Sequence, residues 1–271
     1  MLRPSFRSNW WMTKRNKPHM HPQRVQCGVR IKAVVAYDGT DYHGFQRQSI
    51  ERGPTIQGTL EAALKTIGQA GAVTGAGRTD AGVHASGQVV AFDVNWRHSL
   101  IDLQRALNAV LPDSVAAVEL EQAADEFHPR YDAVSREYQY SLYSSAVRDP
   151  LKQRYALQVP PNLMVDAMQA ASANLIGEHD FAAFGQPTIG ESTIRSMYRA
   201  DVRAADDQIT IELQANGFLY RMVRRIVGTL ITVGRGERSV AEFADILHAA
   251  DPSRAAATIA PNGLCLTKVN Y

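Results

Sequence analysis

Alternating and helically spaced apolar positions divide the first half of the chain into strand and helix segments. Runs rich in β-branched residues predict strands at 29–37, 88–94 and 115–120. Apolar residues three and four apart predict two helices between them, from Thr55 to about Gly68 and from Ser99 to Leu111. Threonine and serine are good N-cap residues, and Pro112 ends the second helix. This succession predicts an α/β arrangement that ends near residue 125.

The second half has the same two kinds of pattern. Its predicted strands are 137–143, 193–204, 208–214 and 263–269, and its predicted helices are about 162–176, 218–233 and 239–250. Asp206 and Asp207 predict a hairpin turn between the second and third of these strands. Ser239 and Glu242 form a capping box for the last helix. Alternation along 137–143 places Tyr138, Tyr140 and Leu142 on one face.

Together these segments predict an α+β protein of two α/β-sandwich-like halves. Each half would carry mixed or antiparallel sheet with flanking helices, and a cleft would lie between the halves. We expect a basic, disordered extension at 1–28, a first half at 29–125 and a second half at 126–271.

The extension carries most of the excess positive charge. Residues 1–30 contain seven basic residues and no acidic one. Three interpretations compete: a flexible basic arm that binds phosphate, an upstream start with Met12 or Met20 as the alternative, and an organellar transit segment. The last fits less well, because an amphipathic helix is hard to draw there.

Composition narrows the class of protein. The chain has 271 residues, of which 45% are hydrophobic and 21% charged, as is usual for a globular protein. Its apolar stretches fall short of the ~18 residues needed to cross a membrane. Cys27 and Cys265 are too few for a disulfide framework, so we expect a soluble protein of the reducing cytoplasm. The net charge is +2, and residues 31–271 hold 22 basic and 27 acidic residues. A polyanion would therefore have to bind at local basic patches.

The segment Gly75-Ala-Gly-Arg-Thr-Asp-Ala-Gly-Val-His-Ala85 presents one carboxylate, Asp80, among glycines. It has Asp80 at the sixth position of a dinucleotide fingerprint, where the third glycine would stand, and it lacks the Gly-Lys-Ser/Thr of a P-loop. An aspartic protease would need a second such aspartate, which is missing. A lone carboxylate on a loop at the end of a sheet can act as nucleophile or proton acceptor, or simply serve a tight turn.

The predicted helix 218–233 is mostly apolar but carries Arg221, Arg224 and Arg225 on one stripe. Arginines of a buried helix need anions, which can be a carboxylate such as Asp80, phosphates outside, or the partner of a structural salt bridge. Tyr138 and Tyr140 are by pattern core residues, but an aromatic residue beside a cleft can also stack on an unstacked base.

Five motifs follow one another along the chain: Tyr37–Gln48, Gly77–Ala85, Phe127–Ala133 with Arg136-Glu-Tyr138, Phe218–Gly228 and Ala260–Leu264. In their sequences and their order, these motifs resemble those of the TruA family of tRNA pseudouridine synthases. The resemblance covers roughly residues 30–271. Two features depart from the family pattern: Cys265 stands where an aromatic residue is common, and the extension before residue 29 is additional.

The resemblance implies the pseudouridine synthase fold and the isomerisation of uridine to pseudouridine at positions 38–40 of the tRNA anticodon stem-loop. It implies that Asp80 is the catalytic carboxylate and that Arg224 pairs with it. Three roles are compatible with the carboxylate: attack on C6 of the base, attack on C1′ of the ribose, and removal of the 2′ proton. For substrate binding it implies Tyr138 stacked on the uracil, Arg78 in the vacated stack and Leu264 in the apolar wall. Three residues are weaker candidates. His84 either contacts the substrate or simply fixes the loop, and Arg221 and Arg225 would face phosphate groups.

The family further implies a homodimer that binds tRNA across both subunits, with no metal and no other cofactor. Two other functions remain open from the residues: a non-catalytic RNA-binding protein of the same fold, and a synthase acting on a different RNA.

Overall fold

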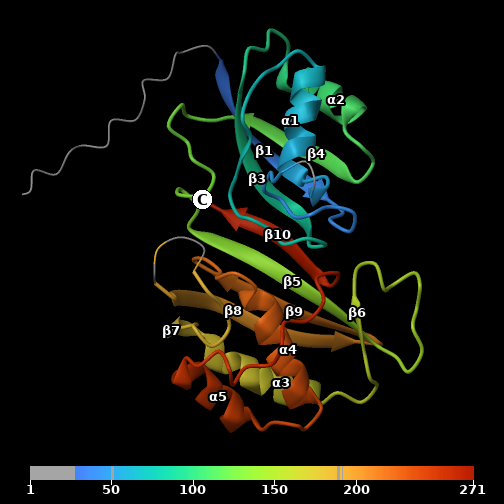
Figure 1. Ribbon diagram of the computed structural model, residues 1–271, viewed down its shortest axis with the longest axis vertical. Helices are drawn as coiled ribbons and strands as arrows, with labels where there is room; N and C mark the ends of the chain where they lie inside the picture. The colour runs from blue at the N-terminus through green and yellow to red at the C-terminus, as the bar shows by residue number, and fades with distance from the viewer. Residues whose placement is uncertain (1–27, 50–51, 188–189, 191) are drawn as a thin grey trace, which may run out of the picture.

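Ten strands form one mixed sheet in the computed structural model, which describes residues 28–49, 52–187, 190 and 192–271. The strand order is β4-β1-β3-β10-β5-β9-β8-β7, with β2 added on β3 and β6 on β5. All pairs are antiparallel except β10 with β3 and β5 with β6. The predicted α+β class with a mixed sheet and flanking helices is therefore confirmed (Figure 1). The predicted extension, apart from Gly28, lies outside the described residues.

The first half supplies one end of the sheet and two helices. Its elements are β1 (Val29–Tyr37), α1 (Ile56–Thr66), β2 (Thr74–Gly75), β3 (His84–Val94), α2 (Leu100–Val110) and β4 (Val115–Gln122). Thr55 and Ser99 cap the two helices as predicted, since each side-chain oxygen accepts a hydrogen bond from a main-chain amide of the first turn.

The second half supplies the other end of the sheet and three α-helices among the described residues. Its elements are β5 (Ser135–Ser144), β6 (Leu157–Val159), α3 (Val165–Ser172), the 3₁₀ helix η2 (Ala173–Leu175), β7 (Gly177–Asp180), β8 (Ile194–Ala205), β9 (Gln208–Ala215), α4 (Met222–Gly234), α5 (Val240–Ala249) and β10 (Leu264–Asn270). The predicted hairpin is formed by β8 and β9, and Asp206 takes the left-handed conformation that its turn requires. The capping box of Ser239 and Glu242 is also confirmed.

The last strand joins the two halves. β10 pairs with β3 on one side and with β5 on the other, so the sheet continues across the predicted boundary. Gly87 makes the close approach possible, because a Cβ there would lie 2.1 Å from the carbonyl oxygen of Thr267. Helices α1 and α2 lie over one end of the sheet and α3, α4 and α5 over the other, with β10 and β5 running between the two groups (Figure 1). The domain boundary near residue 125 stays a prediction.

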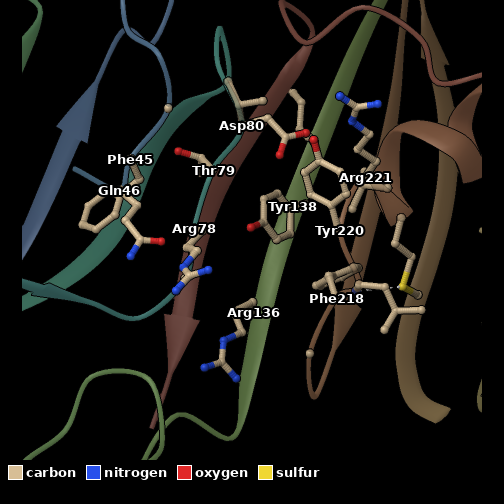
Figure 2. A pocket seen from close by; sticks show the side chains of 18 of the residues that line it. Phe45, Gln46, Arg78, Thr79, Asp80, Arg136, Tyr138, Phe218, Tyr220 and Arg221 are labelled. Atoms are coloured by element: carbon tan, nitrogen blue, oxygen red, sulfur yellow. Dashed lines mark hydrogen bonds between the residues drawn. The ribbon is translucent and has the colours of Figure 1, made fainter. Parts of the chain in front are cut away.

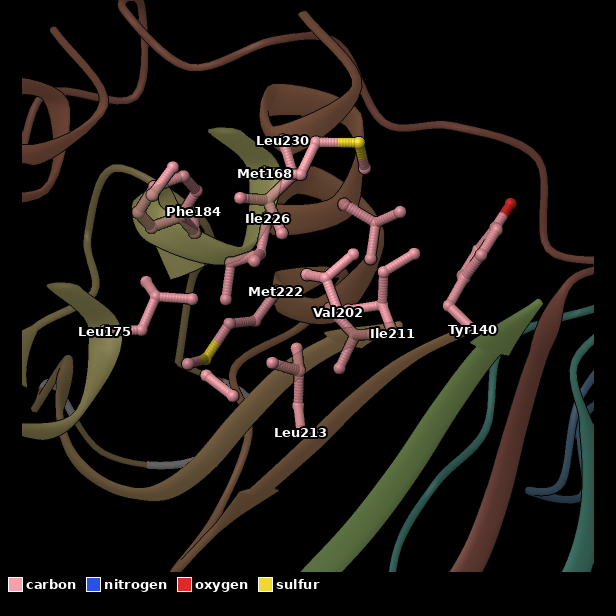
Figure 3. Close-up of a cluster of buried hydrophobic side chains, with 14 of the residues drawn as sticks. Tyr140, Met168, Leu175, Phe184, Val202, Ile211, Leu213, Met222, Ile226 and Leu230 are labelled. Atoms are coloured by element: carbon pink, nitrogen blue, oxygen red, sulfur yellow. The ribbon is translucent and has the colours of Figure 1, made fainter. Parts of the chain in front are cut away.

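Two hydrophobic clusters hold the helices on the sheet. One combines α1 and α2 with β1, β3 and β4, and the other combines α3, α4 and α5 with β5, β8 and β9. In the second cluster Met222, Ile226 and Leu230 of α4 pack in one group with Met168 of α3 and with strand residues Ile211 and Leu213 (Figure 3). Tyr138 contacts both clusters from the central strands. Each side of the middle of the sheet is therefore backed by packed, rigid elements.

Three predicted segments differ from the structure by three residues or more at a boundary. The helix predicted at 218–233 begins only at Met222, because Arg221 has φ +61° and breaks the helical backbone. The strand predicted at 88–94 begins four residues earlier, at His84. The helix predicted at 162–176 is shorter and ends in η2. The pattern did not predict β2, β6 and β7, which have two to four residues each and are too short to show periodicity.

Candidate active site

Main-chain hydrogen bonds fix the loop that carries Asp80, between β2 and β3. The amide of Ala76 donates to Val89 O at 2.8 Å, and the amide of Phe45 donates to Thr79 O at 3.0 Å. On the other side of Asp80, its own carbonyl accepts from the amide of Val83 at 3.2 Å. The loop is thus tied to neighbouring segments before and after the carboxylate, which limits its motion.

Buried polar side chains of β1 and β3 also hold the loop that carries Asp80. The Tyr37 hydroxyl lies 2.9 Å from the Thr79 hydroxyl, within hydrogen-bond distance. Gln88 donates through Nε2 to Gly77 O at 3.0 Å and to the Tyr37 hydroxyl at 3.4 Å. Burial raises the pKa of Tyr37 above its ordinary value, so this hydroxyl stays protonated and neutral. These contacts hold the residues on the N-terminal side of Asp80.

Asp80 forms an ion pair with an arginine 144 residues away. Nη1 of Arg224 donates to Oδ2 of Asp80 at 2.8 Å, and Nε of the same guanidinium donates to Ile259 O at 2.8 Å. The side chains of Arg224 and Asp80 are 13% and 22% exposed, so little water screens the pair. Arg224 lies in the first turn of α4, where the helix dipole also favours a negative charge nearby. Both effects hold the Asp80 carboxylate in one orientation.

Tyr138 forms the aromatic floor next to this pair. It lies on β5, and its ring meets the Phe218 ring edge-on with centroids 4.9 Å apart. Burial raises the pKa of Tyr138 above its ordinary value, so the phenol stays protonated. Leu264, the first residue of β10, adds an apolar side chain to the same cavity.

These side chains line one cleft of about 830 Å³ between the two halves. The structure brings Asp80, Arg224, Tyr138, Arg78 and Leu264 together there, and their catalytic and binding roles stay predictions. Figure 2 shows Tyr138 in the middle, with Arg78 on one side and Tyr220 on the other. Among the described residues that line the cleft, six are arginines and one, Asp80, is acidic. The cleft is therefore strongly cationic although the whole chain is nearly neutral, which suits a polyanionic ligand.

Arg136 is an arginine of the cleft whose structural role the sequence did not reveal. Its guanidinium donates to four main-chain carbonyls: Ala133 O at 3.3 Å, Asn216 O at 2.9 Å, Ala76 O at 3.1 Å and Arg130 O at 2.6 Å. Ala76 begins the Asp80 loop, whereas Asn216 follows β9 in the other half. Arg136 thus connects the two walls of the cleft. Arg136 belongs to one of the five sequence motifs, but hydrogen bonds from a side chain to main-chain carbonyls leave no pattern in a sequence.

His84 and Arg225 do not line the cleft. His84 Nδ1 accepts a hydrogen bond from the amide of Gly39 at 3.1 Å, and its ring packs edge-on against Tyr155. In this position the histidine fastens the turn after β1, and a contact of His84 with substrate stays a prediction. Arg225 donates instead to the carbonyl of Pro252.

Asp38 anchors the same turn to the segment before β6. Its carboxylate accepts hydrogen bonds from the amide and hydroxyl of Thr40, from Nε of Arg154 at 2.6 Å and from the Tyr155 hydroxyl at 2.9 Å. Partial burial opposes the charge, but these donors outweigh it and hold the pKa of Asp38 well below its ordinary value. These contacts link the turn to the second half of the chain.

In the described ranges, no three or more His, Cys, Asp and Glu side chains are grouped so that they could hold a metal ion. None of the helices there is long and apolar enough to cross a membrane.

Comparison with known proteins identifies the family. A family model described as tRNA pseudouridine synthase matches residues 33–132 and 171–271. A protein named tRNA pseudouridine synthase A from Brevibacillus brevis is 43% identical over 244 residues, covering 89% of this chain and 99% of that protein. Proteins of the same name from Geobacillus kaustophilus and Paraburkholderia xenovorans are 40% and 42% identical over 89% of this chain, and over 94% and 90% of their own lengths.

A crystal structure of the archaeal box H/ACA sRNP Nop10–Cbf5 complex is also similar, with a TM-score of 0.34 and 12% identity over 74% of this chain and 44% of that one. At that level it adds nothing to the assignment, which the family model and the curated relatives carry. By these matches over most of its length, the chain belongs to the tRNA pseudouridine synthase family, and it has the pseudouridine synthase fold.

Proposed function

We propose that this protein isomerises uridine to pseudouridine at positions 38–40 of the tRNA anticodon stem-loop, with Asp80 as the catalytic carboxylate. The observation that carries the proposal is the Asp80–Arg224 ion pair at 2.8 Å, inside a cationic cleft with an aromatic floor. The curated relatives, named tRNA pseudouridine synthase A, supply the reaction and the kind of RNA.

The isomerisation needs only the kinds of side chain that line this cleft. The bond between C1′ and N1 breaks, a bond between C1′ and C5 forms, the C5 proton leaves and N1 gains a proton. Atoms and electrons balance without an oxidant or an energy source. Asp80 takes part as the carboxyl group next to the nucleoside, and the hydrogen bond from Arg224 orients it. Walls that exclude water strengthen every electrostatic contact in the cleft.

The uridine must leave its stack to reach Asp80, which costs a few kcal/mol. Tyr138 offers a ring on which the uracil stacks, and Leu264 closes the apolar side of the same space. Arg78, two residues before Asp80 on the loop, occupies the vacated position in the RNA. The other arginines of the cleft contact phosphates, so that binding depends strongly on salt. The proposal also includes a homodimer: two copies of the chain bind one tRNA together in the cytoplasm.

Tritium release tests this function. An unmodified tRNA transcript labelled with tritium at C5 of uracil is incubated with the protein, and the label lost to water is counted. Carbodiimide-stop sequencing of the product then locates each pseudouridine. Stops at positions 38–40 are expected. Release with stops elsewhere would identify a synthase for a different RNA site, and binding without release would identify a non-catalytic RNA-binding protein.

A further inference from the structure

Tyr220 is an exposed aromatic residue inside the cleft that the reaction outlined above does not use. Its side chain is 45% exposed and lines the cleft together with Arg221. The Arg221 guanidinium carbon lies 4.8 Å from the centroid of the Tyr220 ring, in a cation–π contact. A large ring left this open within a concave site is not explained by packing, because burial of the ring would be more favourable.

The backbone under the ring is held firmly. The Tyr220 amide donates to Gln186 O at 2.9 Å, and the two residues form an isolated β-bridge. Gly185 lets the two segments approach, since a Cβ there would lie 2.8 Å from the Tyr220 carbonyl oxygen. The position of the ring is thus set in the free protein, which lowers the entropy lost when a ligand stacks on it.

Arg221 is kept in an unfavourable conformation. It is the N-cap of α4 with φ +61° and ψ 10°, a region that non-glycine residues rarely adopt, and its side chain makes no capping hydrogen bond. Among the described residues no carboxylate forms an ion pair with it. Backbone strain of this kind persists where a side chain must point in a required direction. Here the direction puts a positive charge against the Tyr220 ring, within the cleft.

A ring backed by an arginine binds nucleobases by stacking, whatever their sequence. The flipped uridine already has Tyr138 and Asp80, and Figure 2 shows Tyr220 and Arg221 on the side of Tyr138 opposite to Arg78. We propose that Tyr220 and Arg221 form a stacking site for a second nucleobase, that of a nucleotide adjacent to the flipped uridine. The inference rests on the proposed function, because it assumes an RNA substrate in this cleft.

Binding of three RNAs tests the site. The intact anticodon stem-loop is compared with stem-loops in which the nucleotide before or after the target uridine is abasic. Dissociation constants are measured by fluorescence anisotropy for the wild type, Tyr220→Ala, Tyr220→Phe and Arg221→Gly. Tyr198→Ala is the matched control, since Tyr198 is 54% exposed on β8 and does not line the cleft.

Tyr220→Ala is expected to weaken binding of the intact RNA by about 5- to 150-fold, the range for loss of one base–aromatic stack. Tyr220→Phe keeps the ring and should restore most of that loss. Arg221→Gly should weaken binding while raising the melting temperature by about 2 to 4 °C, because glycine relieves the strained backbone. With one of the abasic RNAs, the wild type and Tyr220→Ala should bind equally.

An equal loss for Tyr220→Ala on the intact RNA and on both abasic RNAs would overturn the proposal, since the ring would then contact the target base or no base. So would a Tyr220→Phe variant that binds as weakly as Tyr220→Ala. Tritium release by the wild type is recorded in parallel. If the RNA is bound with this pattern but no tritium is released, the proposed reaction is wrong and the stacking site stands.

Discussion

Arg224 and Arg225 are neighbours on α4, but only Arg224 lies in the cleft and contacts Asp80. Replacing each arginine by alanine therefore measures what the ion pair contributes to the reaction. Removing one partner of a buried ion pair costs about 3 to 5 kcal/mol. The side chains of Arg224 and Asp80 are 13% and 22% exposed, so water can solvate the remaining carboxylate and reduce this cost. We therefore expect a loss of about 2 to 3 kcal/mol.

We expect the loss of the oriented carboxylate to cost the transition state a similar free energy, which corresponds to a fall in kcat/KM of roughly 30- to 160-fold for Arg224→Ala, at about 1.4 kcal/mol per factor of ten. Arg224→Lys keeps the charge but loses the geometry in which one guanidinium contacts both Asp80 and Ile259 O, so an intermediate loss is expected. Arg225→Ala, which removes only a contact with the Pro252 carbonyl, should stay within about three-fold of the wild type.

The assay is initial-rate tritium release from the labelled transcript, at a temperature well below the melting temperature of every variant. Circular dichroism checks that each variant is folded, because the Arg224 substitutions also leave Ile259 O without this donor. A larger loss for Arg225→Ala than for Arg224→Ala would refute the reasoning. Full activity of a folded Arg224→Ala variant would refute it equally.

Three further predictions concern the scaffold. Arg136→Met should lower the free energy of unfolding by about 2 to 4 kcal/mol, measured in urea, because four carbonyls lose a charged donor; an unchanged midpoint would contradict this. Gly87→Ala should cost about 1 to 3 kcal/mol, since its Cβ would meet the Thr267 carbonyl, whereas Gly77→Ala, with nothing within 4 Å, should melt like the wild type. Asp38→Asn should lose about 1 kcal/mol at pH 7. The folded protein holds the pKa of Asp38 below its ordinary value, so this stabilisation is present above the unfolded pKa of ~3.9 and disappears as the pH falls through the folded pKa. The difference in unfolding free energy between the wild type and Asp38→Asn should therefore be smaller at pH 3 than at pH 7. A larger difference at pH 3 would contradict this.

The periodic pattern predicted the long strands and the capped helices, because these features are local. β1 has the predicted bounds, and Thr55 and Ser99 begin helices where capping chemistry predicts them. The start of α4 was misplaced because residues 218–221 continue the apolar spacing while Arg221 takes a left-handed backbone. Periodicity reports which faces are apolar and contains nothing about φ.

Contacts between segments far apart in the sequence could be predicted only in part. The sequence predicted a last strand but not that β10 lies between β3 and β5, since strand pairing is not local. Asp80 and Arg224 were placed together by the order of five motifs rather than by spacing. His84 belongs to the same motif as Asp80, yet its side chain faces the turn after β1, because motif membership does not fix the direction of a side chain.

The central claim is that Asp80 performs the chemistry. Asp80→Ala removes the carboxylate, and Asp80→Asn keeps its size while removing the charge. Both variants are compared with the wild type by tritium release from the C5-labelled transcript and by anisotropy with the same RNA. We predict that release falls to background in both variants while the dissociation constant changes by less than about ten-fold, because most of the binding comes from phosphate contacts. Release at the wild-type rate by either variant would contradict the account.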